Sequence, residues 1–299
     1  MPAGDRVTAP GHIQFGELLL GPGTPYRWRE LPGWEDSPAL DSGTTPRPSA
    51  HGAYPGDLWA QPRTITVDKL TIRAPGGRIG AAMRELKAGT ALSEDEQPLV
   101  VMLDERGPLL VWARCLRQAI PIGKGYRTGT VAGCALQFEA SDPRRYSLDE
   151  QSAETALPRD EAGLDWHVTA DPATESLLSL DLGSAGSAGT LTVTNAGDAP
   201  APAVLAFRGP VSGPSLTDTA TGRTWSYDIE LAAGDELLVD GATGEVTLAG
   251  ASRLYTTTGA PEQLLVVPPG VSEFAFRAAP DTPIDPAARA VLRWRHAYW

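Results

Sequence analysis

The four histidines are the residues of this chain best suited to bind a metal ion or to transfer a proton. They are scattered along the sequence, at His12, His51, His167 and His296. Two imidazoles share one metal when they stand four residues apart on a helix, as in His-x-x-x-His, and this pattern does not occur. The Gly-x-Ser-x-Gly nucleophile elbow and the Gly-rich phosphate loop are missing from the sequence as well. We therefore predict no metal ion, no cofactor and no catalytic residue.

Carboxylates and thiols offer no better basis for catalysis. A glycosidase needs two acids that face each other across about 5–10 Å. Asp235 and Glu236 are adjacent, so on a strand they would point to opposite faces. Cys115 and Cys134 lie in apolar, strand-like runs without a Cys-x-x-Cys partner, which predicts buried free thiols.

Aromatic residues of the second half give a different hypothesis, the binding of a sugar by ring stacking. Trp166, Trp225 and Tyr255 are the candidate sugar contacts. Trp225 and Tyr227, however, share one strand face, which a hydrophobic core would also require. A carbohydrate-binding protein therefore remains an alternative reading, and a glycoside hydrolase with a β-sandwich fold is a further one.

The first half contains the elements that would position such residues. Hydrophobic periodicity predicts a helix with Ile79, Met83 and Leu86 on one face, ended by Gly89. A five-residue turn containing Gly joins two apolar runs, which predicts a β-hairpin. The strands expected from alternation are His12–Leu18, a strand from Arg63 with an irregularity near Asp68 and Lys69, the hairpin strands Pro98–Leu103 and Leu109–Cys115, and Thr128–Ala140.

Between these elements, residues 21–59 form a long loop-like region rich in Pro, Gly, Ser and Trp. A structureless loop of this length is unusual in a compact domain and generally indicates function or docking against a neighbour. Trp28, Trp34, Tyr54 and Trp59 lie within it or at its end. These aromatics either pack under the loop or anchor another subunit.

The second half consists of short strands separated by turns, with almost no helical period. This pattern predicts a β-sandwich of jelly-roll type. An Asp-Pro step after Phe138 and a change of charge place the domain boundary near residue 147, giving domains 1–147 and 148–299. The expected strands are Leu164–Thr169, Leu177–Leu182, Leu191–Thr194, Ala203–Arg208, Thr224–Leu231, Glu236–Val239, Glu245–Leu248, Gln263–Val267, Ser272–Arg277 and Ala290–Arg295.

Charge is divided unequally between the halves. Residues 1–145 carry a formal charge of +1 and residues 146–299 carry −13, within a chain of 299 residues. The acidic half disfavours nucleic acid and favours a solvated surface. No apolar run has the length of a signal peptide or a membrane span, so we expect assembly in the host cytoplasm and no membrane insertion.

The order of short motifs along the chain resembles the distal tail protein family of long-tailed phages with flexible tails, including the related minor tail proteins of actinobacterial phages. The likeness covers nearly the whole chain. In the first half the motifs are Phe15-Gly16, His51-Gly52, Arg63–Val67, Met83–Leu86 and Phe138–Tyr146. In the second half they are Thr194–Asp198, Gly209, Thr219–Gly222 and Leu231–Asp240.

This resemblance implies a structural component of the virion tail tip and not an enzyme. It implies a mainly β fold, with an N-terminal β-sandwich-like ring domain that has one helix and a β-hairpin, followed by a C-terminal galectin-like or jelly-roll sandwich. The N-terminal domains would form a hexameric ring that joins the tail tube protein to the tail-associated hub protein and fibres, and DNA would pass through the ring without specific binding. In such a ring, Trp28, Trp34, Trp59 and Arg84 are the candidate residues of the subunit interface.

Overall fold

The computed structural model describes residues 2–75, 77–159, 186–280, 282 and 284–299. Their contacts divide the chain into two compact units: unit 1, Met1–Asp149 with Ala297–Trp299, and unit 2, Glu150–His296. The sequence places the last three residues in the second domain, whereas the structure returns them to unit 1. The reason is strand pairing, because Tyr298 pairs with Arg145 and Ala297 pairs with Tyr146.

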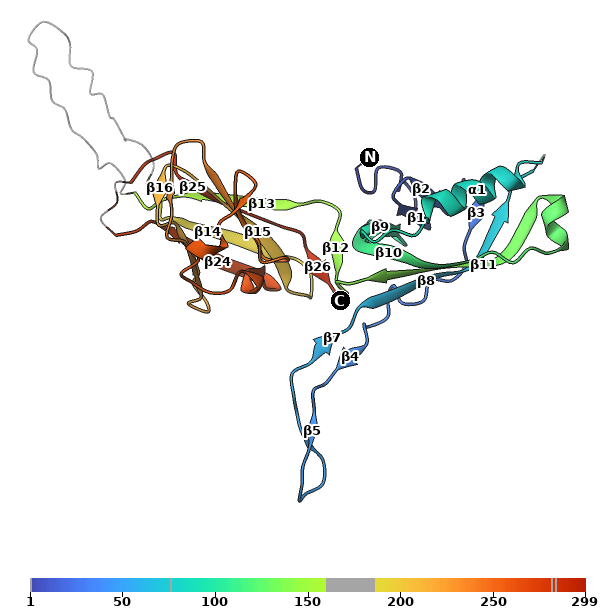
Figure 1. Ribbon diagram of the computed structural model, residues 1–299, viewed down its shortest axis with the longest axis horizontal. Coiled ribbons are helices and arrows are strands. Elements are labelled where there is room, and N and C mark those ends of the chain that lie inside the picture. Colours follow the sequence, from blue (N-terminus) through green and yellow to red (C-terminus); the bar gives the residue numbers. More distant parts are fainter. Residues whose placement is uncertain (1, 76, 160–185, 281, 283) are drawn as a thin grey trace, which may run out of the picture. The chain divides into compact units, whose positions relative to one another are not determined.

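Unit 1 is an antiparallel sheet that folds back on itself (Figure 1). Along the sheet the strands follow the order β2-β1-β9-β10-β11-β8-β3, and β12 joins β10 to β26. The strands are β1 (His12–Phe15), β2 (Leu18–Leu20), β3 (Tyr26–Arg27), β8 (Arg63–Arg73), β9 (Gln97–Met102), β10 (Leu109–Ala119), β11 (Thr130–Ala140), β12 (Arg145–Ser147) and β26 (Ala297–Tyr298). The predicted hairpin of residues 98–115 is confirmed as β9 and β10.

Two parts of this sheet enclose the core of unit 1. The rings of Phe15 in β1 and Phe138 in β11 are 4.8 Å apart between centroids, although the two strands are not neighbours in the sheet. The long strand β8 supplies buried residues to this core on both sides of an irregularity, where Lys69 adopts a φ of 51°. Before Lys69 the buried residues of β8 have odd numbers, and after it they have even numbers. This change of phase confirms the irregularity predicted near Asp68 and Lys69.

The helix α1 (Ile79–Gly89) is confirmed, and its apolar face packs into this core. Ile79, Ala82 and Leu86 are its buried residues. A short 3-10 helix, η1 (Lys124–Thr128), connects β10 to β11. A side-chain hydrogen bond links the helix to the sheet, because the hydroxyl of Tyr26 in β3 donates to the carbonyl of Ala82 at 2.8 Å.

Replacing Tyr26 by phenylalanine is expected to lower the free energy of unfolding by about 1 kcal/mol, since the buried Ala82 carbonyl then loses its side-chain donor. Burial raises the pKa of the Tyr26 hydroxyl, so the native group stays protonated and the bond persists below a pH of about 10. Urea unfolding checks the effect, with Tyr54→Phe as the control because Tyr54 is 57% exposed. Equal stability of both variants would contradict the role of this bond.

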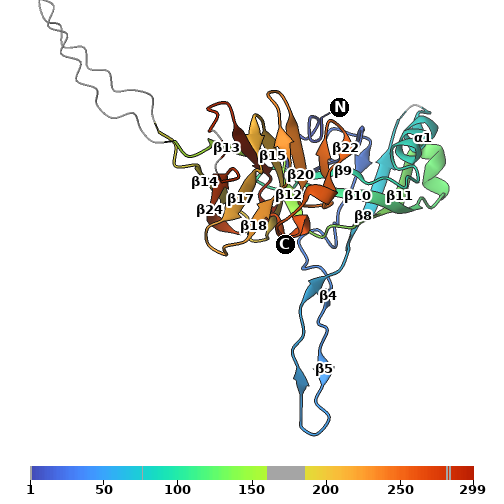
Figure 2. The same cartoon turned by 60° about the vertical axis from the view of Figure 1, so that its left-hand side comes forward.

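Unit 2 is a sandwich of two antiparallel sheets (Figure 2). The larger sheet has the order β13-β25-β15-β20-β21-β22, with β23 added to β15, and the smaller has the order β14-β24-β17-β18. Rings from the two sheets meet between them, with Phe207 of β15 and Phe276 of β24 5.6 Å apart between centroids. The mainly β fold and the C-terminal sandwich predicted from the sequence are thereby confirmed.

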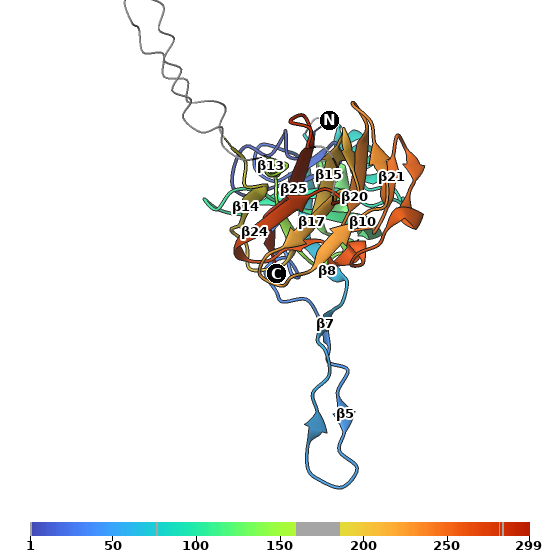
Figure 3. The same cartoon turned by 90° about the vertical axis from the view of Figure 1, so that its left-hand side faces the viewer.

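The elements of unit 2 follow the predicted strands in most places (Figure 3). Two expectations need correction. Residues 224–231 form two short strands instead of one, and the strand expected at Gln263–Val267 is limited to its last two residues because residues 262–264 form a 3-10 helix. The expected strands at 164–169 and 177–182 lie outside the described residues. The strands are β13 (Gln151–Ala156), β14 (Thr190–Asn195), β15 (Ala201–Arg208), β16 (Val211–Ser212), β17 (Ser215–Asp218), β18 (Thr224–Ser226), β19 (Glu230–Leu231), β20 (Glu236–Asp240), β21 (Val246–Leu248), β22 (Ala251–Ser252), β23 (Val266–Val267), β24 (Gly270–Arg277) and β25 (Arg289–Trp294), with the 3-10 helices η2 (Leu254–Thr256) and η3 (Glu262–Leu264).

Candidate interaction surfaces

Residues 39–61 of unit 1 form a long two-stranded arm, in place of the structureless loop that the sequence suggests (Figure 3). Near its root β4 (Leu40–Asp41) pairs with β7 (Trp59–Ala60), and near its tip β5 (Thr45–Pro46) pairs with β6 (Ala53–Tyr54). Each strand is only two residues long, so no alternation is visible in the sequence. We call this segment the arm.

Backbone contacts hold the two strands of the arm together between these pairs. A Cβ at Gly56 would lie 2.3 Å from the carbonyl oxygen of Gly43 on the opposite strand, so this crossing requires glycine. At the tip the backbone N–H of Arg47 donates to the carbonyl of Gly52 at 3.1 Å. The guanidinium of Arg47 also lies 5.1 Å from the ring centroid of Tyr54.

The arm exposes large apolar side chains on both of its strands. Leu40, Tyr54, Leu58 and Trp59 are 57–66% exposed. An isolated two-stranded ribbon is marginally stable in water, and exposed aromatic and aliphatic groups close together usually mark a binding surface. The arm is therefore a candidate interaction surface.

The root of the arm is fixed by a buried arginine. Arg63, the first residue of β8, is 2% exposed. Its Nη1 group lies 2.8, 3.1 and 2.6 Å from the carbonyl oxygens of Gly33, Trp34 and Asp36, and its Nε donates to the carbonyl of Pro143 at 2.6 Å. One side chain thus joins the segment that enters the arm to the turn between β11 and β12.

A second buried arginine, Arg145, lies close to Arg63 at the root of the arm, and we call the two arginines and their contacts the root cluster. Arg145 is 7% exposed, and its guanidinium lies 3.0 Å from a carboxylate oxygen of Glu35 and 6.0 Å from the ring centroid of Trp34. It also donates a hydrogen bond to the carbonyl of Trp299. Burial and the nearby positive charge of Arg145 lower the pKa of Arg63, whereas the carboxylate of Glu35 opposes this shift.

The four residues that the sequence suggests for a subunit interface differ in their exposure to solvent. Trp34 is 1% exposed and belongs to the core of unit 1, so it has no surface to offer to another subunit. Trp28 packs partly against the core and donates from its indole N–H to the carbonyl of Gly11 at 2.8 Å. Trp59 is 66% exposed on the arm, and Arg84 is exposed on α1.

The sequence analysis missed Leu40 and Leu58, which lie beside Trp59 near the root of the arm. Neither stands in an apolar run, and single exposed leucines are common on protein surfaces. The pairing of β4 with β7 brings Leu40 close to Leu58 and Trp59. The signal that was present in the sequence is the density of Pro and Gly around them, which indicates a non-core segment.

The candidate sugar contacts of unit 2 also differ in their exposure to solvent. Trp225 is 1% exposed, and its indole N–H donates to the carbonyl of Pro261 at 3.1 Å, so the ring cannot stack on a sugar. Tyr255 is 80% exposed in η2. Trp166 lies outside the described residues. Within the described part of unit 2, sugar stacking by these residues could use Tyr255 alone.

Replacing Trp225 by alanine is expected to destabilise unit 2 by about 3–5 kcal/mol, because truncating a large buried aromatic leaves a cavity. Thermal unfolding of the purified protein measures this loss. Tyr255→Ala removes an exposed ring and serves as the matched control, with a melting temperature close to that of the natural chain. A Trp225→Ala variant that unfolds like the natural protein would show that the ring is not a core element.

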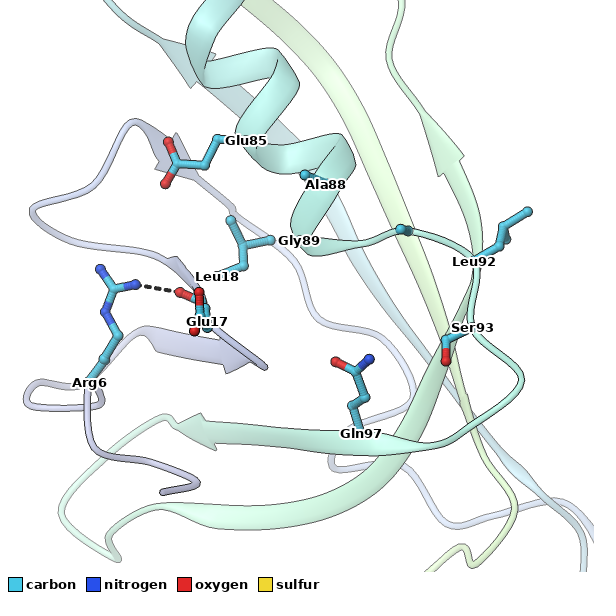
Figure 4. Close-up of a pocket in the computed structure, with 10 residues that line it drawn as sticks. Arg6, Glu17, Leu18, Glu85, Ala88, Gly89, Leu92, Ser93 and Gln97 are labelled. Carbon is cyan, nitrogen blue, oxygen red and sulfur yellow. Dashed lines mark hydrogen bonds between the residues drawn. The ribbon is translucent and has the colours of Figure 1, made fainter. Parts of the chain in front are cut away.

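A pocket of unit 1 lies beside α1 and is lined by residues from the first strands (Figure 4). Its volume is about 480 Å³, and Arg6, Glu17 and Glu85 are its charged residues. The Arg6 guanidinium is engaged by the carbonyl of Glu17, and Leu18 packs against Gly89 at the end of the helix. The polar side chains drawn in Figure 4 do not converge on one point.

Among the described residues, no group of three or more His, Cys, Asp or Glu side chains could hold a metal ion. Cys115 and Cys134 are buried and free, as the sequence predicts, and burial raises the pKa of both thiols. Within the described part of the chain, no helix is long and apolar enough to cross a membrane.

Known structures with this arrangement come from phage tails. The chain is similar to the Dit protein of phage SPP1, described as a paradigm of the hub adsorption apparatus in phages that infect Gram-positive bacteria, with a TM-score of 0.63 and 11% identity over 96% of this chain and 99% of that chain. It is also similar to a chain of the phage P2 baseplate in its activated conformation with Ca, with a TM-score of 0.51 and 9% identity over 95% of this chain and 97% of that one. The P2 baseplate with Sr gives a TM-score of 0.50.

No family model and no curated protein matches the sequence. The structural likeness spans both units and shows that the chain has the fold of the phage Dit protein. The resemblance to distal tail proteins that the sequence motifs suggest is therefore confirmed at the level of the fold.

Proposed function

We propose that the chain is a structural hub protein of a phage tail tip. In this proposal unit 1 forms a ring of copies, six by analogy with the family that the sequence resembles, which joins the tail tube protein to the tail-associated hub protein and fibres. DNA passes through the ring without sequence-specific binding. The protein acts by assembly and not by turnover, and it is built in the host cytoplasm and resides in the virion.

The arm is the observation that carries this proposal. Its four exposed apolar side chains gain burial only when another surface covers them. In a ring, each copy meets its neighbour through two different surfaces, and a projecting arm that reaches an adjacent copy suits such a contact. The fold shared with SPP1 Dit, whose description refers to a hub adsorption apparatus, supports the same assignment.

Sedimentation velocity and negative-stain microscopy of the full chain test the proposal. We expect a discrete oligomer that appears as a ring at micromolar concentration. A chain that stays monomeric at high concentration, both alone and mixed with the tail tube and hub proteins of the same phage, would refute it.

A further inference from the structure

Strand pairing gathers arginines on the outer face of the sheet of unit 1. Arg27 in β3 pairs with Thr71 in β8, and Arg73, two residues further along β8, pairs with Thr130 in β11. Directly paired residues of antiparallel strands point to the same face, as do residues two apart on one strand. Both arginines are exposed, while their neighbours Tyr26 and Ile72 are buried on the other face.

Arg29 completes this cluster. Arg27, Arg29 and Arg73 line one hollow of about 730 Å³, together with the Trp28 ring and threonines that include Thr130. No carboxylate lines this hollow among the described residues. We call the three arginines the arginine face.

Within the described part of the chain, none of the three side chains of the arginine face forms a hydrogen bond or an ion pair. The two acidic residues that lie nearby contact Lys69 instead. Glu30 pairs with Lys69, and the carboxylate of Asp68 accepts the backbone N–H of Lys69 at 2.7 Å. The protein as a whole has 37 acidic residues and 25 Lys plus Arg. Although carboxylates are in excess, none of them forms an ion pair with these three arginines within the described residues.

We propose that the arginine face binds phosphates of the backbone of double-stranded DNA, without reading its sequence. The planar guanidinium group matches phosphate oxygens with two parallel hydrogen bonds. Arg27 and Arg29 are two residues apart on extended backbone, about 7 Å, so they can contact different phosphates of one strand. DNA presents a fixed negative charge about every 1.7 Å along its axis, a density that matches clustered arginines better than dispersed protein carboxylates do.

This proposal refines the expectation that the acidic chain disfavours nucleic acid. Residues 146–299 carry a formal charge of −13, whereas the arginine face lies in the first half, which carries +1. Contacts to phosphates alone carry no sequence information, so they agree with passage of DNA without specific binding. The proposal does not depend on ring formation, because the three arginines belong to one copy.

Fluorescence anisotropy with a short labelled duplex of random sequence tests the proposal on the full chain. Three phosphate contacts predict a log-log salt slope of about −2.7, which is a loss of affinity of roughly 40-fold between about 50 and about 200 mM salt. We expect the variant Arg27→Gln, Arg29→Gln, Arg73→Gln to bind at least about tenfold more weakly at low salt, with a flatter slope. Circular dichroism confirms that the variant folds, since all three side chains are exposed.

The matched control removes the same charge from other exposed positions, with Arg78→Gln, Lys87→Gln and Arg117→Gln. This control is expected to keep most of the affinity. Absence of DNA binding by the natural chain at low salt, or equal losses in both triple variants, would overturn the proposal. Loss of self-association in the arginine-face variant, followed by sedimentation velocity in the same samples, would overturn it too, because the face would then contact an acidic surface of another copy.

Discussion

Replacing Arg63 by methionine is expected to lower the free energy of unfolding by about 3 kcal/mol, because the substitution removes a buried cation from several backbone carbonyl groups at once. The side chain is 2% exposed and contacts the carbonyls of Gly33, Trp34, Asp36 and Pro143. Methionine has a similar length but no donor. Each carbonyl that remains buried without a partner then costs free energy.

Chemical unfolding followed by tryptophan fluorescence measures this loss, since Trp34 lies beside Arg63 in the core. Arg106→Met is the matched control, because Arg106 forms ion pairs with Asp104 and Glu35 but is exposed to solvent. Exposed ion pairs contribute little to stability, so the control is expected to unfold like the natural protein. If Arg63→Met were as stable as Arg106→Met, the cluster at the root of the arm would not be a structural element.

Arg63→Met is also expected to loosen the arm. Three of the four carbonyls that Arg63 contacts belong to residues 33–36, which lead directly into the arm at residue 39. Without these contacts the direction of the arm is no longer fixed by the core of unit 1. A surface that must meet a neighbouring copy in one geometry depends on such fixing, since disorder at an interface has to be removed on binding.

Much of this fold follows from the sequence because its elements are local. The apolar residues of α1 repeat at helical spacing, and the strands of the β9–β10 hairpin are joined by a short turn with Gly107. The shift in phase along β8 is visible as two alternating runs that are out of step. In each case residues close in the chain decide the local structure, and tertiary packing agrees with them.

The features that the sequence did not predict depend on contacts between distant residues. Trp34 and Trp59 are both tryptophans in a Pro- and Gly-rich region, yet one is fully buried and the other is exposed. The two residues differ in exposure because Trp34 is held by contacts with later strands. Arg63 donates to its backbone carbonyl, and the guanidinium of Arg145 lies over its ring. The arginine face is likewise invisible in the sequence, because Arg73 reaches Arg27 only through the register of β3 with β8.

Replacing Leu58 and Trp59 by serine is expected to abolish the ring formation that we propose, while leaving the monomer folded. The two side chains are 65% and 66% exposed, so their loss removes little from the core of unit 1. Burying them against a neighbour is worth about 4 kcal/mol per contact, and its loss weakens each contact roughly a thousand-fold. A closed ring repeats this loss at every interface, and sedimentation velocity should then show monomer alone.

The matched control for the arm removes a similar apolar surface elsewhere. Leu92 and Tyr255 are 81% and 80% exposed and lie outside the arm, so Leu92→Ser with Tyr255→Ser tests the effect of lower surface hydrophobicity as such. We expect this control to assemble like the natural chain. Intact rings from the arm variant would show that the arm is not the contact between copies, whereas equal dissociation of both variants would show that its apolar side chains act without specificity. If the control assembles and the arm variant does not, the apolar side chains of the arm must be in contact with a neighbouring copy. Such a contact would remove these exposed apolar groups from water.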